Sequence, residues 1–423
     1  MVSLPTTSAD PRKDEFYGAL IERTVRGLVD TLGAGNLEAV LLIGAPTRGE
    51  ATVVETPDGL YSLSDIDLVC VAAAAADRAD LDRRLAPWRG DLNEELQSCT
   101  KGVDVSVRTR DEIASLPALI ATYEMLRAPT VVWGDPNVVQ CLPTMKIDEI
   151  PQADGLTLLH NRIVEALLLH GHVSSARPDR YATLTILYGT AKLALDAVTA
   201  ILYAERNVPP GYGERVEVFR NAVLAGNAPL RGRLADYVDD LAPWARFKTE
   251  GDLDGLAEHL GGPTVNLDEL AREVWRRYAR YADVFWREIL GRLTRTDAGD
   301  TGLVDTTALY AGLESVPRSI GRTWRLSRRG AAPDGLFSAR ALLKGALFAS
   351  PRQRAYLTAV VAYLALAGAA DPDVADHLVR KYSPFRAPAG HPSIAADGGR
   401  VPLLESLARF HEALLLGRRP GRR

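Results

Sequence analysis

The sequence predicts an α+β protein in which an N-terminal domain with a mixed sheet precedes a mainly α-helical region. Apolar runs with strand character occur only within about the first 150 of the 423 residues, and apolar residues at helical spacing dominate afterwards. Hydrophobic residues make up 47% and charged residues 25% of the chain, which is typical of globular proteins and excludes a mainly disordered one.

In the N-terminal domain the residue pattern predicts two helices. The first begins at Asp10-Pro11, because Asp is a favoured N-cap and Pro is favoured at the first helical position, and it ends at Gly33. The second covers about Asp77–Leu96 and is expected to be interrupted near Pro87, because proline breaks helices.

Four strands accompany these helices, each recognised as a short apolar run bounded by glycine or polar residues. Between the first two strands, Pro57-Asp58-Gly59 is typical of a hairpin turn. The strands are expected at Ala39–Ile43, Ile66–Ala73, Val103–Val107 and Thr130–Trp133.

Beyond about residue 155 the pattern is helical, and loops rich in Gly, Pro and Asp separate the helices. We predict an α/β domain at 1–150, a helical domain at 151–296 and a helical region at 297–423, with one undivided helical region as the alternative. The helices are expected at Leu156–His172, Tyr181–Tyr203, Val216–Leu224, Leu267–Leu293, Ala339–Leu347, Gln353–Ala367 and Leu403–Leu416.

Composition narrows the classes of partner and compartment. A net charge of −4 argues against broad electrostatic capture of nucleic acid, which needs a basic face. Three scattered cysteines and an N-terminus without an apolar signal core favour the cytoplasm. The most apolar stretch, Leu357–Ala370, has 14 residues and is too short to cross a membrane, so we expect no membrane partner. His160, His170 and His172 lack further ligands at metal spacing, so zinc is not expected.

The most informative residues are three acids in the predicted strands. Asp65 and Asp67 stand two apart at the start of the second strand, so both project from one face of it. In the third strand, Asp104 alternates with valines. Neighbouring carboxylates repel each other, and a divalent cation is the usual compensation. Three acids on two neighbouring strands can hold two metal ions roughly 3.5–4 Å apart, an arrangement that serves nucleotidyl displacement; a calcium site or an exposed edge is the alternative.

Gly44 ends the first strand and leads into a loop that contains Thr47 and Arg48. A glycine here lets the backbone approach a ligand closely, and a helix start presents N–H groups to phosphate oxygens. Arg48 is either a charge-assisted phosphate ligand or an ordinary structural cation.

Taken in order, these residues resemble the signature of the nucleotidyltransferases of the DNA polymerase beta superfamily. The resemblance implies transfer of a nucleoside monophosphate from an NTP to an acceptor, with pyrophosphate leaving. The matching residues lie within roughly residues 35–140 and are Gly44, Arg48-Gly49-Glu50, Ser64-Asp65-Ile66-Asp67-Leu68 and Val103-Asp104-Val105.

By this resemblance, two Mg²⁺ ions would be held by Asp65 and Asp67, and Asp104 would share one of them and orient the acceptor. The acceptor, whether a small molecule, a protein or RNA, stays open. The residues expected to contact the nucleotide are Gly44, Thr47, Arg48, Ser64 and Lys192.

Two features leave alternatives open. Lys192 lies four residues before Asp196 in an apolar helix, and it either forms an ordinary helix ion pair or points at the NTP phosphates. The family usually has a serine after the glycine, whereas this chain has Ala45 and then Pro46, which has no N–H; Thr47 is the candidate substitute. This departure supports the alternative of a degenerate nucleotidyltransferase-like nucleotide-binding or scaffold protein without catalysis.

Overall fold

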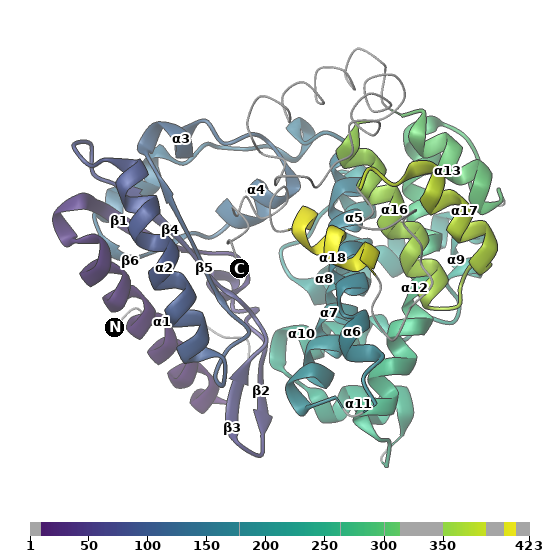
Figure 1. Cartoon of the computed structure of the whole chain (residues 1–423), viewed down its shortest axis with the longest axis horizontal. Helices are drawn as coiled ribbons and strands as arrows, with labels where there is room; N and C mark the ends of the chain where they lie inside the picture. The colour runs from purple at the N-terminus through teal and green to yellow at the C-terminus, as the bar shows by residue number, and fades with distance from the viewer. Residues whose placement is uncertain are drawn as a thin grey trace. The chain divides into compact units, whose positions relative to one another are not determined.

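The computed structural model describes residues 10–176, 178–262, 264–299, 301–313, 350–385 and 402–411 (Figure 1). It confirms the predicted α+β class, with a small mixed sheet in the N-terminal part of the chain and helices after it. The chain divides into two compact units. Unit 1 consists of Met1–Asp154, Glu205–Val218 and Asp240–Thr264, and unit 2 of Gly155–Ala204, Phe219–Asp239 and Val265–Arg423.

The four predicted strands of unit 1 form one sheet in the order β5-β4-β1-β6. Strand β1 pairs antiparallel with β4 and with β6, whereas β4 and β5 run parallel, so the predicted mixed sheet is confirmed. A separate hairpin brackets the predicted turn at 57–59. The strands are β1 (Leu37–Ile43), β2 (Val53–Thr56), β3 (Gly59–Ser62), β4 (Ile66–Ala72), β5 (Val103–Arg108) and β6 (Thr130–Gly134).

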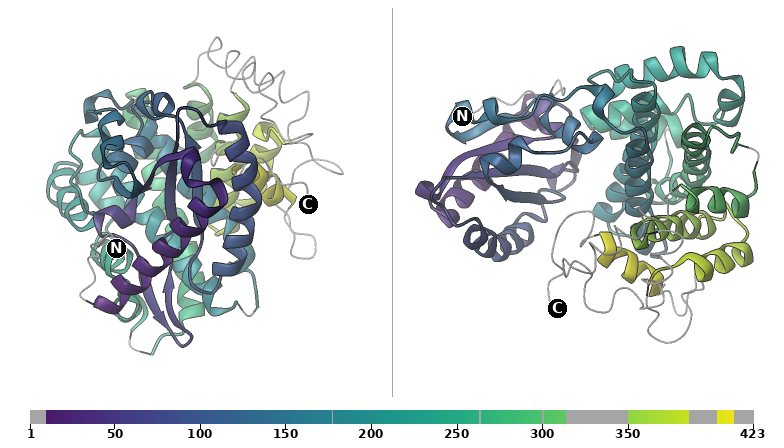
Figure 2. Two further views of the ribbon diagram at one scale, coloured as in Figure 1. Left: turned by 90° about the vertical axis from the view of Figure 1, so that its left-hand side faces the viewer. Right: turned by 90° about the horizontal axis from the view of Figure 1, so that it is seen from above.

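Two long helices, α1 (Pro11–Leu32) and α2 (Arg78–Leu96), cover one face of this sheet and lie in front of it in the left view of Figure 2. As predicted, the Asp10 side chain caps α1 by accepting the Arg12 N–H, and Gly33 ends it. The opposite face carries a smaller apolar cluster to which α3 (Arg110–Ala114) contributes Ile113. Another short helix, α4 (Ile120–Leu126), follows α3 along the chain.

The predicted interruption of the second helix at Pro87 is wrong. Helix α2 runs without a break from Arg78 to Leu96, with Pro87 inside it. Leu81 and Leu85 before the proline and Leu92 and Leu96 after it are all buried, so both halves of the helix pack on the sheet. Pro87 itself is exposed, where water can satisfy the carbonyl that the proline leaves without a donor.

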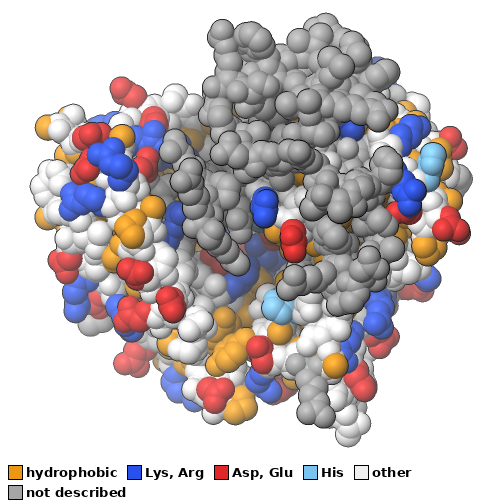
Figure 3. All heavy atoms as spheres, in the orientation of Figure 1, with side chains coloured by type: hydrophobic (Ala, Val, Ile, Leu, Met, Phe, Trp, Pro, Cys, Tyr) orange, Lys and Arg blue, Asp and Glu red, His pale blue; other side chains and the backbone are white. Residues whose placement is uncertain are grey.

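Charges of both signs are interspersed on the outer sides of α1 and α2, as the face of unit 1 in Figure 3 shows. Several pair within one helix: Arg26 with Glu22 at 3.1 Å, and Arg83 with Asp80 at 3.0 Å. Such exposed pairs contribute little to stability, about 0.3–0.5 kcal/mol each.

Two later segments complete unit 1, an association that the sequence pattern did not predict. They carry α8 (Tyr212–Val218), α10 (Leu241–Glu250) and α11 (Leu253–Gly261). Arg215 of α8 and Lys248 of α10 are buried, which is rare for cations without partners. Their hydrogen bonds to the N-terminal part of the unit are described below.

Unit 2 is built on the pair α7 (Arg180–Ala204) and α12 (Leu267–Thr294), two helices that the sequence predicted. Tyr281 of α12 donates a hydrogen bond to the Ala194 carbonyl of α7 at 2.7 Å. Helix α5 begins two residues before unit 2, and the rest of it belongs to this unit. The other described helices of unit 2 are α5 (Ala153–Leu168), α6 (His170–Val173), α9 (Ala228–Arg233), α13 (Leu303–Ala311), α16 (Pro351–Leu366), α17 (Pro372–Tyr382) and α18 (Pro402–Phe410).

Two of the other helices predicted for the helical part differ in the structure from their predicted form. The stretch predicted as one helix at 156–172 forms two, α5 and α6, and the stretch at 216–224 is the end of α8 followed by a π-helical turn at Phe219–Leu224. The predicted helix Ala339–Leu347 and the end of the one at 403–416 lie outside the described residues. The division between 296 and 297 stays a prediction.

Helix α7 is, among the described residues, the one helix long and apolar enough to cross a membrane by length and composition. However, 83% of its most apolar window is buried inside the protein. This burial is what the core helix of a soluble protein shows. A cytoplasmic location stays a prediction.

Candidate functional site

The three candidate acids gather at the start of two neighbouring strands. Asp67 is the second residue of β4 and Asp104 the second residue of β5, and the parallel register pairs them directly. Asp65 immediately precedes β4. Since neighbouring strands lie about 4.8 Å apart, the Asp67 and Asp104 side chains leave one face of the sheet side by side. The expectation of acids on neighbouring strands is confirmed for Asp67 and Asp104, whereas Asp65 lies just before its strand; we call Asp65, Asp67 and Asp104 the acidic corner.

Asp65 has contacts on both its backbone and its side chain. The Tyr17 hydroxyl of α1 donates to the Asp65 carbonyl at 3.2 Å. The carboxylate lies 3.6 Å from Nζ of Lys101, a residue of the loop before β5, and the two side chains are 35% and 30% exposed. A Cβ on Gly102 would lie 3.7 Å from the other carboxylate oxygen. Lys101 is a member of the site that sequence reasoning missed.

Asp104 also has a cationic neighbour, which comes from helix α2. Nη1 of Arg89 lies 3.4 Å from an Asp104 carboxylate oxygen and donates to the Val105 carbonyl at 3.3 Å. Arg89 is the second residue that sequence reasoning missed. Because its partners are 15 and 16 residues away in the sequence, no local spacing rule identifies the pair.

Helix α2 also supplies the hydrogen bonds that the outer edge of the sheet lacks. Strand β5 is an edge strand, so alternate backbone groups of it have no strand to pair with. The Asn93 amide accepts the Val103 N–H at 2.7 Å and donates to the Val103 carbonyl at 3.0 Å, as a neighbouring strand would. Arg78 donates to the Val107 carbonyl at 3.3 Å. Asn93 therefore holds the residue that precedes Asp104.

Gly44, at the end of β1, borders the acidic corner. Its φ of +81° is a conformation that side-chain-bearing residues rarely adopt, and a Cβ there would lie 3.4 Å from Oδ2 of Asp67. The loop then makes a 3₁₀ turn at Ala45–Arg48, in which the Thr47 hydroxyl donates to the Gly44 carbonyl at 2.8 Å. The structure thus brings Gly44 next to the acids, and Thr47 stabilises the turn that follows.

Arg48 takes part in a group of ion pairs inside unit 1. Its Nε donates to Glu50 at 3.0 Å and its Nη1 to the Glu124 carbonyl at 3.0 Å. Arg215 donates to both carboxylate oxygens of Glu124, at 2.8 and 3.0 Å. Burial alone would lower the pKa of Arg215, but the charge and hydrogen bond of Glu124, together with the charges of Tyr212 and Glu50, outweigh it and raise that pKa. Arg48 is thus engaged by carboxylates of its own unit, and its contact with phosphate stays a prediction.

Ser64 is buried and holds the backbone that leads to the acids. Its hydroxyl oxygen accepts the Thr52 N–H at 2.9 Å. Thr52 in turn bonds to α10, because Lys248 Nζ donates to the Thr52 hydroxyl at 3.2 Å and to the Glu50 carbonyl at 3.0 Å. The position of Ser64 is therefore that of a supporting residue directly before Asp65.

Lys192 belongs to unit 2, on α7. Its Nζ lies 3.5 Å from the Glu165 carboxylate and 5.7 Å from the centre of the Tyr188 ring. Asp196, one turn along, lies 2.7 Å from Nε of Arg162. An ion pair for Lys192 is thus present with a residue of α5, and its role toward a nucleotide stays a prediction.

Whether the acidic corner suits a metal ion depends on its donors and on space. Within the described part of the chain, no three His, Cys, Asp or Glu side chains lie close enough together to hold one. The corner does offer carboxylate oxygens, the donors that Mg²⁺ prefers, and Gly44 leaves open the space beside Asp67 that a side chain would fill. These residues fit Mg²⁺ if the Asp65 and Asp104 carboxylates turn away from Lys101 and Arg89.

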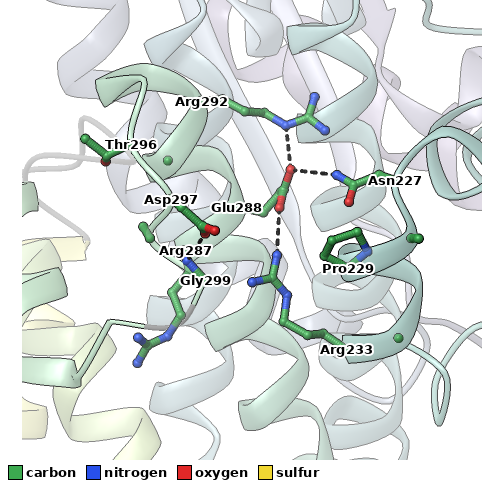
Figure 4. Close-up of a pocket in the computed structure, with 13 residues that line it drawn as sticks. Asn227, Pro229, Arg233, Arg287, Glu288, Arg292, Thr296, Asp297 and Gly299 are labelled. Atoms are coloured by element: carbon green, nitrogen blue, oxygen red, sulfur yellow. Dashed lines mark hydrogen bonds and ion pairs between the residues drawn. The ribbon is translucent and has the colours of Figure 1, made fainter.

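Unit 2 contains a cavity of about 660 Å³ that no sequence pattern indicated (Figure 4). At its centre, Glu288 of α12 accepts hydrogen bonds from Asn227 at 3.3 Å, Arg233 at 3.0 Å and Arg292 at 2.9 Å. None of the sequence-predicted site residues lines it. The lining residues are Asn227, Ala228, Pro229, Gly232, Arg233, Arg287, Glu288, Gly291, Arg292, Thr296, Asp297, Ala298 and Gly299.

Comparison with known proteins adds no assignment to this geometry. No protein-family model matches the chain, and no curated protein sequence matches it.

Proposed function

We propose that the chain is a Mg²⁺-dependent nucleotidyltransferase that transfers a nucleoside monophosphate from an NTP to an acceptor. The observation that carries the proposal is the direct pairing of Asp67 with Asp104 across two parallel strands, with Asp65 just before β4. Carboxylates placed side by side in this way need a positive partner, and divalent cations with phosphate ligands supply one.

The proposal divides the roles in catalysis among the three acids. Asp65 and Asp67 would hold the two ions, and Asp104 would share one of them and orient the acceptor. When bound, the ions neutralise the charge that develops on the transferred phosphoryl group and its leaving group. The Gly44 loop would accommodate the phosphates, because a backbone without a Cβ allows close approach.

A second candidate is a degenerate nucleotidyltransferase-like nucleotide-binding or scaffold protein without catalysis. Ala45 and Pro46 occupy the positions where a phosphate-binding hydroxyl and N–H are expected. In addition, Arg48 is bonded to Glu50, which leaves the phosphates one cation fewer.

The acceptor of the proposed enzyme is a small molecule, a protein or RNA. The interspersed charges of α1 and α2 favour the first two over a long nucleic acid, because capture of a polyanion depends on a continuous basic face. Lys192 stays a candidate phosphate ligand.

Calorimetry with a non-hydrolysable NTP analogue and Mg²⁺ tests the proposal on the full chain. We expect metal-dependent binding in the wild type and its loss in Asp67→Asn. Glu94→Gln, which changes an exposed acid of α2, removes the same charge and serves as the matched control. If the wild type shows no metal-dependent binding of the NTP analogue, the proposal that the chain is a nucleotidyltransferase is refuted.

Labelled NTPs then separate the two candidates. Transfer of label to any acceptor in a cell extract, abolished by Asp67→Asn, supports the enzyme. Binding without transfer supports the degenerate protein, and Ala45→Ser distinguishes further: a large rise in NTP affinity indicates an impaired catalytic site, whereas no change indicates a site that has lost this role.

A further inference from the structure

Two of the three acids in the acidic corner have a cation beside them. Lys101 Nζ lies 3.6 Å from Asp65, and Arg89 Nη1 lies 3.4 Å from Asp104. The two cations come from different elements, a loop and a helix, and their partners are 36 and 15 residues away in the sequence. Neither pair therefore follows from helical spacing. Both pairs are partly exposed, so ions in solution have access to them.

These contacts have the geometry of loose ion pairs. Strong charge-assisted hydrogen bonds have donor–acceptor distances of about 2.7–2.9 Å, and both pairs are longer. Arg89 also donates to the Val105 carbonyl, so this guanidinium stays at the sheet edge when Asp104 turns away. Lys101 has a flexible side chain that is 30% exposed, so it can move out into water.

We propose that Lys101 and Arg89 act as internal counter-ions of the acidic corner and compete with divalent cations for its carboxylates. This inference rests on the proposed function and adds a device that weakens metal binding at the same site. In the absence of metal, the ammonium and guanidinium groups reduce the repulsion among Asp65, Asp67 and Asp104. For a divalent ion to bind these carboxylates, Lys101 would have to leave Asp65 and Asp104 would have to turn away from Arg89.

The competition has a size that can be measured. The repulsion between the Lys101 charge and a divalent ion at the same carboxylates, together with the partly exposed ion pair that must be broken, corresponds to roughly a 5- to 20-fold weaker affinity in a water-like dielectric. Removal of the Lys101 charge should therefore tighten binding by about that factor. A purely structural role of Lys101 predicts the opposite, weaker binding in a distorted site.

Calorimetric titration of the full chain with Mn²⁺ alone, without nucleotide, tests the inference. Lys101→Met should bind Mn²⁺ roughly 5- to 20-fold more tightly than the wild type. Lys101→Arg, which keeps the positive charge, should bind Mn²⁺ with the wild-type affinity. Lys146→Met, at an exposed lysine of the same unit, makes the same change in net charge and should alter the affinity less than about twofold. The shift in unfolding temperature on addition of Mn²⁺ gives a second readout that does not depend on activity.

The outcomes separate this inference from the proposed function. Equal or weaker binding in Lys101→Met, with binding abolished by Asp67→Asn, overturns the counter-ion role and leaves the nucleotidyltransferase proposal intact. Absence of Mn²⁺ binding in both the wild type and Lys101→Met overturns the counter-ion role, and the titration with the NTP analogue and Mg²⁺ then decides on the proposed function. Tighter binding in Lys101→Met that Asp67→Asn abolishes supports both.

Discussion

The stability of unit 2 should depend on pH through one buried histidine, His160 of α5. Its ring stacks on Tyr356, with centroids 4.9 Å apart, and meets the edge of Tyr310 at 5.0 Å. The residue is 2% exposed, and its buried Nε2 has no hydrogen-bond partner among the described residues. Burial lowers the pKa of His160 from 6.5 to about 3, because the charged ring would lose its hydration.

The direction and size of the effect follow from linkage. Below pH 6.5 the unfolded chain binds a proton at His160, whereas the folded protein does not until about pH 3. The contribution of the neutral ring is therefore complete above pH 6.5 and is lost as the pH falls toward 3, at about 1.4 kcal/mol per pH unit. Between pH 7 and pH 5 the free energy of unfolding should fall by about 2 kcal/mol from this residue alone.

Urea unfolding at pH 7, 6 and 5 measures this contribution. His160→Phe keeps the ring contacts without a titrating group, so its free energy of unfolding should fall by about 2 kcal/mol less than that of the wild type over this range. His172→Phe, at an exposed histidine of α6, should behave as the wild type does. The same pH dependence in His160→Phe and in the wild type would refute the reasoning, as would an NMR titration that finds the ring charged at pH 5.

Two further substitutions test the edge of the sheet and the cavity of unit 2. Asn93→Ala removes both hydrogen bonds that α2 makes to β5 and should lower the free energy of unfolding by about 2 kcal/mol, at about 1 kcal/mol per bond; an equal loss in Glu94→Ala, on the exposed side of the helix, would contradict this. Glu288→Gln leaves Arg233 and Arg292 without their carboxylate partner. It should lower the free energy of unfolding, measured by urea denaturation, by about 2 kcal/mol. The exposed Glu273→Gln on the same helix should cost under about 0.5 kcal/mol, and similar values for both glutamates would show that the cavity carboxylate is not structural.

The acids of the candidate site could be predicted because their placement follows from local chain geometry. Side chains alternate along a strand, so the pattern around Asp67 and Asp104 determines which face they leave, and the burial of β5 alternates as expected. Their cationic partners could not be predicted. The Lys101–Asp65 and Arg89–Asp104 contacts depend on which strands become neighbours and on how α2 lies along the edge, which are properties of the whole unit.

The same distinction explains the error at Pro87. The local rule is correct that proline removes a helical hydrogen bond and favours a break. The helix nevertheless continues through Pro87, because leucines on both sides of it are buried against the sheet. Each buried leucine contributes about 1.5–3 kcal/mol, and together these contributions exceed the roughly 3 kcal/mol cost of the proline. Patterns within one helix do not reveal this balance before the packing partner is known.

The dispersed origin of unit 1 has a consequence for its synthesis. Arg215, which is buried, is made 91 residues after its partner Glu124, and Lys248 is made 196 residues after Thr52. A ribosome adds about 5–20 residues per second, so the strands emerge on the order of ten seconds before the helices that complete the unit. During that interval Glu124 and Thr52 lack these two partners, and release of the last segment, up to Thr264, is the step that allows unit 1 to be completed.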